Sequence, residues 1–257
     1  MLNCLTFGDP GPAPTVLIAH GLFGSARNWS VICKRLSDRG RVVAVDMRNH
    51  GASFHSDEHT YPAMAQDLAG VIDSIGSPVD VIGHSMGGKA AMQLALDHPD
   101  KLRRIVVGDI APVRYTHSQQ PFIEAMRRVD LTGVTRRTDA ARQLADFGVE
   151  PALQSFFTQS LDVATRRWRL NLDALEQNMP DIMGFPETDG VWKGPALFLS
   201  GALSDYVLPE HRSSIRRLFP AARFAKIPGA GHWLHADKPR EFEAALRVFL
   251  DFNAPPE

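Results

Sequence analysis

One stretch of the sequence decides the fold: Val79-Asp80-Val81-Ile82-Gly83-His84-Ser85-Met86-Gly87-Gly88. Its first four residues are typical of a buried strand, and the residues that follow it favour a helix. The pattern Gly-x-Ser-x-Gly between them is typical of a sharp strand-to-helix turn that exposes a serine. Gly83 and Gly87 have no Cβ, so the strand and the helix can approach closely around this turn. We therefore expect an α/β protein in which Ser85 lies at a helix N-terminus, where backbone dipoles favour negative charge.

Similar apolar runs recur along the chain, with helical periodicity between them. The predicted strands span residues 16–19, 42–45, 79–82, 105–107, 196–199 and 223–227. The predicted helices span residues 26–36, 62–75, 87–97, 210–218 and 239–249. Continuous apolar strands that alternate with helices are typical of a parallel sheet covered on both faces. We therefore expect a mostly parallel central sheet flanked by helices.

The region between residues 115 and 191 has a different pattern. Strand-like runs stop there, and apolar residues recur at helical spacing instead. The simplest interpretation is an inserted cap of several short helices. We expect residues 1–114 and 192–257 to form the core and residues 115–191 to form the cap, with disorder only in the tail, 254–257.

The composition excludes several classes of protein. A chain of 257 residues with 44% hydrophobic residues is long enough to bury one full core. Its formal net charge of -1 offers no basic field for nucleic acid, which we do not expect as a partner. The apolar runs are all too short for a membrane span. Because the chain has two cysteines, Cys4 and Cys33, and no secretory signal pattern, we expect reduced thiols and a cytoplasmic protein.

A serine nucleophile needs a base, and one of the ten histidines is well placed to be that base. His232 lies in Gly229-Ala230-Gly231-His232-Trp233, directly after the last predicted strand, so its side chain comes from a loop near the turn at Ser85. His235 is the alternative base, but it lies nearer the final helix. We expect His84 to point away from the pocket side of Ser85 and to be structural.

Two carboxylates compete for the role of the acid that orients the base. Asp109 and Asp205 both follow predicted strands at the edge that carries Ser85. The acid usually lies three residues after a glycine, in the turn that follows the strand before the last one. Three residues after Gly201 the chain has Ser204, so Asp205 is displaced by one residue. We favour Asp109, keep Asp205 as the alternative, and regard Ser204 as a candidate fourth member of the site.

Attack on a carbonyl creates an oxyanion, which two backbone N–H groups must stabilise. One should belong to Met86, the residue after the nucleophile. The other should come from the loop that follows the strand at 16–19, where we choose Leu22 first and Phe23 second. We expect no metal and no cofactor, because no cluster of histidine, cysteine and carboxylate side chains has metal-ligand spacing.

Five strings together resemble the α/β-hydrolase family along nearly the whole chain, and most closely its YbfF-like esterase branch. They are His20-Gly21-Leu22-Phe23-Gly24-Ser25, Val45-Asp46-Met47-Arg48-Asn49-His50-Gly51, Gly83-His84-Ser85-Met86-Gly87-Gly88-Lys89, Asp109-Ile110-Ala111-Pro112-Val113 and Gly229-Ala230-Gly231-His232-Trp233. The resemblance implies that the acid lies in the Asp-Ile-Ala-Pro segment and that a serine occupies the usual acid position. It thus supports Asp109 and Ser204, with Asp205 as the alternative acid.

The resemblance also implies a reaction, the hydrolysis of acyl esters with short chains and of acyl thioesters. It implies that the cap and Trp233 shape the acyl pocket, in which we also place Phe23. We therefore predict a carboxylesterase that acts on a small-molecule acyl ester or thioester through an acyl-enzyme. The alternatives are a thioesterase or carbon–carbon bond hydrolase with the same residues, and a ligand-binding protein with little turnover.

Overall fold

A seven-stranded sheet runs through the computed structural model, which describes residues 1–76 and 78–251. The strands lie in the order β1-β3-β2-β4-β5-β8-β9. Their bounds are Cys4–Phe7 (β1), Val16–Ala19 (β2), Val42–Val45 (β3), Val79–His84 (β4), Leu102–Gly108 (β5), Ala196–Gly201 (β8) and Ala222–Ile227 (β9). β1 pairs with β3 antiparallel, and the other neighbouring strands pair in parallel, so the predicted sheet is confirmed. The expected disorder of the tail, 254–257, lies outside the described residues.

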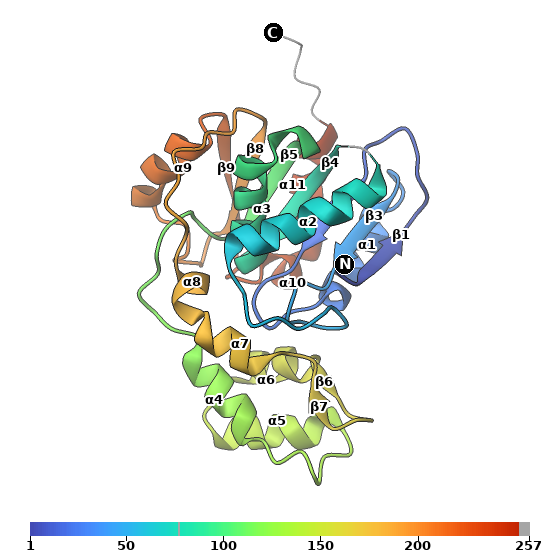
Figure 1. Cartoon of the computed structure of the whole chain (residues 1–257), viewed down its shortest axis with the longest axis vertical. Helices are drawn as coiled ribbons and strands as arrows, with labels where there is room; N and C mark the ends of the chain where they lie inside the picture. The colour runs from blue at the N-terminus through green and yellow to red at the C-terminus, as the bar shows by residue number, and fades with distance from the viewer. Residues whose placement is uncertain (77, 252–257) are drawn as a thin grey trace.

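Helices cover both faces of the sheet (Figure 1). One face carries α2 (Tyr61–Ile75), α3 (Met86–Asp97) and α9 (Arg212–Leu218), and the other carries α1 (Ser30–Leu36), α10 (Leu234–Asp237) and α11 (Pro239–Asp251).

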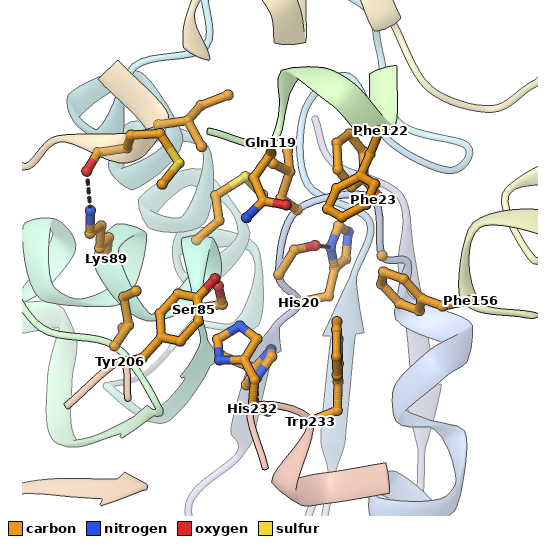
Figure 2. A pocket seen from close by; sticks show the side chains of 18 of the residues that line it. His20, Phe23, Ser85, Lys89, Gln119, Phe122, Phe156, Tyr206, His232 and Trp233 are labelled. Atoms are coloured by element: carbon orange, nitrogen blue, oxygen red, sulfur yellow. Dashed lines mark hydrogen bonds between the residues drawn. The ribbon is translucent and has the colours of Figure 1, made fainter. Parts of the chain in front are cut away.

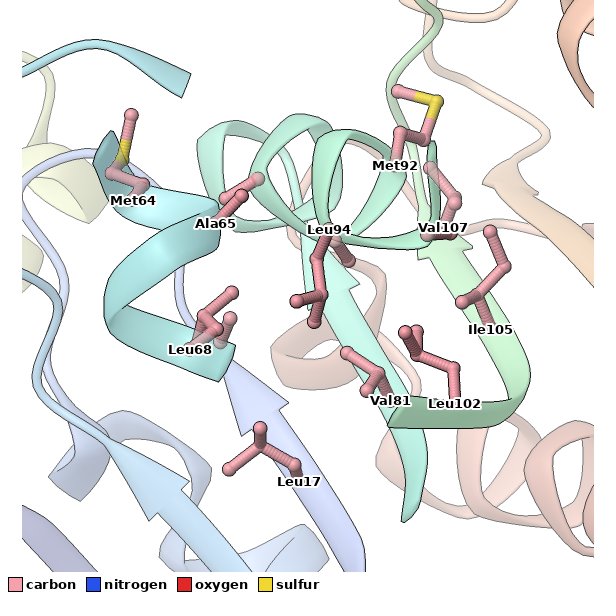
Figure 3. Close-up of a cluster of buried hydrophobic side chains, with 14 of the residues drawn as sticks. Leu17, Met64, Ala65, Leu68, Val81, Met92, Leu94, Leu102, Ile105 and Val107 are labelled. Carbon is pink, nitrogen blue, oxygen red and sulfur yellow. The ribbon is translucent and has the colours of Figure 1, made fainter. Parts of the chain in front are cut away.

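Alternation within the strands divides the core between these two faces. In β2, Leu17 faces the α2 and α3 side while Ile18 faces the α1 and α11 side. Figure 3 shows Leu17 and Val81 of the sheet beneath side chains of α2 and α3. Within residues 1–76 and 78–251, no helix is long and apolar enough to cross a membrane.

The structure differs from the predictions in its short elements. β1 is an edge strand with half of its residues exposed, so its apolar signal is weak. The helix predicted at 26–36 begins as the 3-10 turn η1 (Ala26–Trp29), and the first two residues of the one predicted at 210–218 belong to the 3-10 turn η3 (Pro209–His211). A third such turn, η2 (Pro99–Lys101), and α10 are single turns, which are too short to show a period.

The chain between β5 and β8 forms most of the lower lobe in Figure 1. Its helices are α4 (Gln120–Arg128), α5 (Arg137–Asp146), α6 (Pro151–Thr158), α7 (Leu172–Gln177) and α8 (Met179–Met183). An antiparallel pair, β6 (Leu161–Asp162) and β7 (Arg167–Trp168), was not predicted, because strands of two residues carry no alternation. The buried side chains of this lobe form a cluster of their own, which Phe23 from the loop after β2 joins.

Candidate active site

Ser85 lies in the sharp turn between β4 and α3. Its φ of 53° and ψ of -120° are a strained combination for a residue with a Cβ. The Ser85 N–H donates to the Gly108 carbonyl at 2.9 Å and ties the turn to β5. A Cβ at Gly83 would collide with the Gly87 backbone, and a Cβ at Gly87 would collide with the backbone of Ala19. The two glycines therefore permit the turn that presents Ser85 to a cavity.

His232 follows β9 and reaches the same cavity as Ser85 (Figure 2). Its Nδ1 donates to Asp109 Oδ2 at 2.8 Å, which leaves Nε2 available as a proton acceptor. Asp109 comes from the end of β5 and is fully buried, while the His232 side chain is 15% exposed. The fold thus brings together three side chains, Ser85, His232 and Asp109, from the ends of three different strands.

Asp109 is held by further donors besides His232. The Gly201 N–H donates to its Oδ1 at 3.1 Å, and the Ser204 hydroxyl donates to its Oδ2. These bonds offset the cost of burying the carboxylate and fix its orientation. Asp205 is exposed, and no hydrogen bond joins it to His232 within residues 1–76 and 78–251.

The loop after β2 and the start of α3 offer the two expected N–H groups. Leu22 and Met86 both line the cavity, and neither N–H is hydrogen-bonded within the part of the chain that the structure describes. The Phe23 N–H, by contrast, donates to His50 Nε2 at 3.1 Å. Phe23 has a φ of 64°, so its backbone is in the left-handed region. The geometry thus favours Leu22 over Phe23 as the second donor.

Three buried histidines lie beside this loop and were not predicted as site residues. His20 Nδ1 donates to the Gly21 carbonyl at 2.8 Å, and its Nε2 accepts from the Met47 N–H at 3.0 Å. The ring centroids of His20 and His50 are 5.1 Å apart, and those of His50 and His59 are 5.6 Å apart. Burial lowers the pKa of all three, that of His59 to about 3. They are therefore neutral near pH 7. The sequence did not predict that they meet, because the three residues lie 9 to 39 positions apart in the chain.

Two further histidines, His84 and His235, lie next to the ring or the loop of His232. His84 Nε2 donates to the His232 carbonyl at 2.8 Å. His84 also borders the cavity, and its ring lies beside those of Trp29 and His235, with centroids 6.2 Å and 4.8 Å away. The strand ends at His84, and its ring turns toward the loop of His232. His235 stacks on Trp29 with ring centroids 4.1 Å apart, and burial lowers its pKa to about 3. It has no carboxylate partner among the described residues.

The cavity has a volume of about 430 Å³ and two different sides. Figure 2 shows aromatic side chains on one side of Ser85 and His232, those of Phe23, Phe122, Phe156 and Trp233. Phe122 and Phe156 belong to α4 and α6 of the lower lobe. Trp233 and Phe156 lie with ring centroids 6.1 Å apart, so the lobe and the loop after β9 close this side together.

The opposite side of the cavity carries Lys89 and Tyr206 (Figure 2). Lys89 Nζ donates to the carbonyls of Val113 at 3.0 Å, Met183 at 3.1 Å and Gly184. All three protons of an ammonium group are thereby used, so Lys89 offers no free donor to a bound ligand. No aspartate, glutamate or arginine is among the described residues that line the cavity. The site therefore suits an uncharged ligand.

Comparisons with known proteins agree with this arrangement. A model described as the alpha/beta hydrolase family matches residues 16–245. The chain is 44% identical over 248 residues to the sn-1-specific diacylglycerol lipase ABHD11 of Mus musculus, covering 92% of this chain and 81% of that protein. It is 38% identical over 243 residues to the esterase YbfF of Escherichia coli, covering 93% of each chain. A solved structure of a marine microorganism esterase matches with a TM-score of 0.91 at 37% identity, covering 96% of this chain and 98% of that one.

Proposed function

The chain belongs to the alpha/beta hydrolase family and is a serine ester hydrolase, and we propose that it is a carboxylesterase acting through Ser85, His232 and Asp109. One observation carries the assignment of these residues. His232 donates to the buried Asp109 at 2.8 Å while it shares a cavity with Ser85, which lies in a strained turn.

In the proposed reaction, Ser85 Oγ attacks the ester carbonyl while His232 Nε2 accepts the hydroxyl proton. The carbonyl oxygen becomes an oxyanion, to which the N–H groups of Leu22 and Met86 donate. When the tetrahedral intermediate collapses, the bond to the alcohol breaks and His232 returns its proton to the departing oxygen. Water then attacks the acyl-enzyme in the same way and releases the acid.

Asp109 has two roles in this mechanism. Its bond to Nδ1 selects the tautomer of His232 in which Nε2 can accept a proton. Its charge stabilises the imidazolium that forms during each attack. Ser204 and Gly201 keep the carboxylate oriented, so we propose Ser204 as a fourth member of the site.

The cavity supports an uncharged substrate with a short acyl chain. Its volume of about 430 Å³ is at the lower end of the range for ligand pockets, about 300–1,000 Å³. We propose that the aromatic side, with Phe23 and Trp233, holds the acyl chain and that residues 115–191 act as a cap over it. Diacylglycerol, which the name of the mouse relative specifies, is a second candidate substrate because the described lining offers no free charge.

We also propose that the protein is cytoplasmic. Cys4 and Cys33 are both free, which suits a reducing compartment. We propose that the reaction needs no metal or cofactor, because the serine, the imidazole and the two N–H groups supply every proton transfer and charge contact in it.

The test is hydrolysis of p-nitrophenyl esters of increasing acyl length by the wild type and three variants. Ser85→Ala should be inactive, and Asp109→Asn should lose about 10³- to 10⁴-fold in kcat because the imidazole adopts the wrong tautomer. Asp205→Asn should stay within about twofold of wild type, because Asp205 is exposed. Circular dichroism should first confirm that all four proteins are folded.

Other outcomes would redirect the assignment. A collapse of activity in Asp205→Asn alone would move the acid to Asp205. A wild type that cleaves acyl thioesters but no ester would be a thioesterase. A wild type that turns over neither, but whose Tm rises when an ester is added, would be a binding protein.

A further inference from the structure

The ring of Tyr206 lies against the imidazole of His232. Their centroids are 3.9 Å apart and their planes differ by 21°, so the two rings are stacked. Tyr206 comes from the turn after β8, two residues beyond Ser204, and it lines the cavity beside Ser85 (Figure 2). We propose that Tyr206 is a positioning residue that holds the His232 ring in its working orientation and stabilises the ring when it is protonated. This inference rests on the proposed role of His232 as the base.

The backbone of Tyr206 is anchored on both sides. Its N–H donates to Ser204 Oγ at 3.3 Å, and that hydroxyl donates to Asp109. Its carbonyl accepts from the Tyr115 hydroxyl at 2.7 Å. Tyr206 therefore contacts both parts of the site: its backbone binds Ser204, which holds Asp109, and its ring covers His232.

The phenol of Tyr206 is anchored as well. Its oxygen lies 2.9 Å from His117 Nε2, within hydrogen-bond distance. Burial raises the pKa of Tyr206 to about 12, so its phenol is uncharged near pH 7. With its backbone and its hydroxyl both held, the ring has little freedom to move away from His232.

Stacking restricts the one motion that would disable the base. A rotation of the imidazole about its bond to Cβ would break the 2.8 Å bond from Nδ1 to Asp109. Tyr206 covers one face of the ring, while His84 and Trp233 lie with centroids 4.8 Å and 5.5 Å away. A rotated ring would collide with these neighbours, so the stack keeps Nε2 on the Ser85 side.

The stack of Tyr206 on His232 also stabilises the positive charge of the protonated imidazole. During attack, His232 gains a proton, and the electron-rich face of an aromatic ring attracts a cation. Tyr206 thus favours the protonated form, which resembles the transition state more than the resting state. Removal of the ring makes His232 release its proton more readily. The neutral, active form of His232 then persists to lower pH, so the acidic limb of the kcat/KM profile shifts to lower pH.

The experiment compares Tyr206→Leu with Tyr206→Phe on p-nitrophenyl acetate over a range of pH. We expect Tyr206→Leu to lower kcat about tenfold or more, to change KM less than about threefold, and to move the acidic limb down by up to about one pH unit. Tyr206→Phe keeps the ring and should restore the wild-type position of the limb. Leu203→Ala, at a residue of the same turn that is 76% exposed, is the matched control and should behave as wild type.

A second series keeps the shape of the ring and changes only its charge distribution. Phenylalanines with one, two and three fluorine atoms at position 206 withdraw electrons from the ring face. The acidic limb should move down stepwise with each fluorine. A limb that stays in place across this series and in Tyr206→Leu, with kcat also unchanged, would overturn the inference. The proposed function would still stand if Ser85→Ala is inactive and Asp109→Asn loses about 10³- to 10⁴-fold in kcat, and it would fail separately if Ser85→Ala is active.

Discussion

His50 controls the backbone of the loop that carries Leu22. Its Nδ1 donates to the Arg48 carbonyl at 2.8 Å, and its Nε2 accepts from the Phe23 N–H at 3.1 Å. That bond holds Phe23 in its left-handed conformation, which otherwise costs free energy for a residue with a Cβ. Because a protonated imidazole could not accept, His50 has to be neutral, and burial lowers its pKa well below the usual value.

We predict that His50→Ala weakens both the loop and catalysis. The Phe23 N–H would be buried without an acceptor, which costs about 1–3 kcal/mol of unfolding free energy. The Leu22 N–H would shift away from the oxyanion, so kcat should fall by about tenfold or more. Urea unfolding and ester hydrolysis measure the two effects. His55→Ala, an exposed histidine in the same region, is the control. Wild-type kcat in His50→Ala would contradict this role.

Lys89 joins α3 to both connections of the lower lobe. Its Nζ donates to Val113, where the chain leaves the sheet for the lobe, and to Met183 and Gly184, where the chain returns. The Nζ also lies 5.6 Å from the centre of the Tyr61 ring and 4.8 Å from that of Tyr115. The helix that begins after Ser85 is thereby tied to the segment that closes the cavity.

This buried ammonium should make stability depend on pH in a defined window. Burial lowers the pKa of Lys89 to about 7 in the folded protein, against about 10.4 for an exposed lysine. Between these values the unfolded chain binds a proton that the folded protein does not. The stability of the wild type should therefore rise with pH relative to Lys89→Met, by up to about 1.4 kcal/mol per pH unit.

Urea unfolding of both proteins at pH 6, 7.5 and 9 measures that difference. We expect little change below pH 7 and a growing advantage of the wild type above it. Parallel curves across the whole range would mean that the three carbonyls keep Lys89 charged and that burial does not lower its pKa.

The acyl side of the cavity is built by two parts of the chain that are far apart in sequence. Phe156 of α6 and Trp233 after β9 meet there with ring centroids 6.1 Å apart. Because both rings limit the space beside Ser85, the lobe and the sheet together determine how long an acyl chain fits.

We predict that Phe156→Ala shifts the preference toward longer chains. Each added methylene that enters the new space gains about 0.8 kcal/mol, or roughly fourfold in kcat/KM. The ratio of kcat/KM for hexanoate over acetate esters should therefore rise by about fourfold to tenfold. Phe147→Ala is the matched control, since Phe147 packs on Arg128 and does not line the cavity. An unchanged ratio in Phe156→Ala would place the acyl chain on the other side.

The sequence by itself determined six of the seven strands of the central sheet, the turn at Ser85 and the loop of His232. These features depend on residues that are close together: a buried strand, a Gly-x-Ser-x-Gly turn and a helix are visible within ten residues. The identity of the acid was harder to predict, because Asp109 and Asp205 each follow a predicted strand. The one-residue displacement of Asp205 favoured Asp109, and the resemblance to a family supported that choice, but Asp205 stayed open as the alternative.

Only the tertiary structure decided which side chains meet. The bond from His50 to Phe23 spans 27 positions, and the contact of Lys89 with Met183 spans 94. The stack of Tyr206 on His232 likewise joins the turn after β8 to the loop after β9. Such contacts depend on the order and register of the strands and on how the lobe packs over them. Local patterns carry no information about them, because periodicity reports which face of an element is buried and not what lies against it.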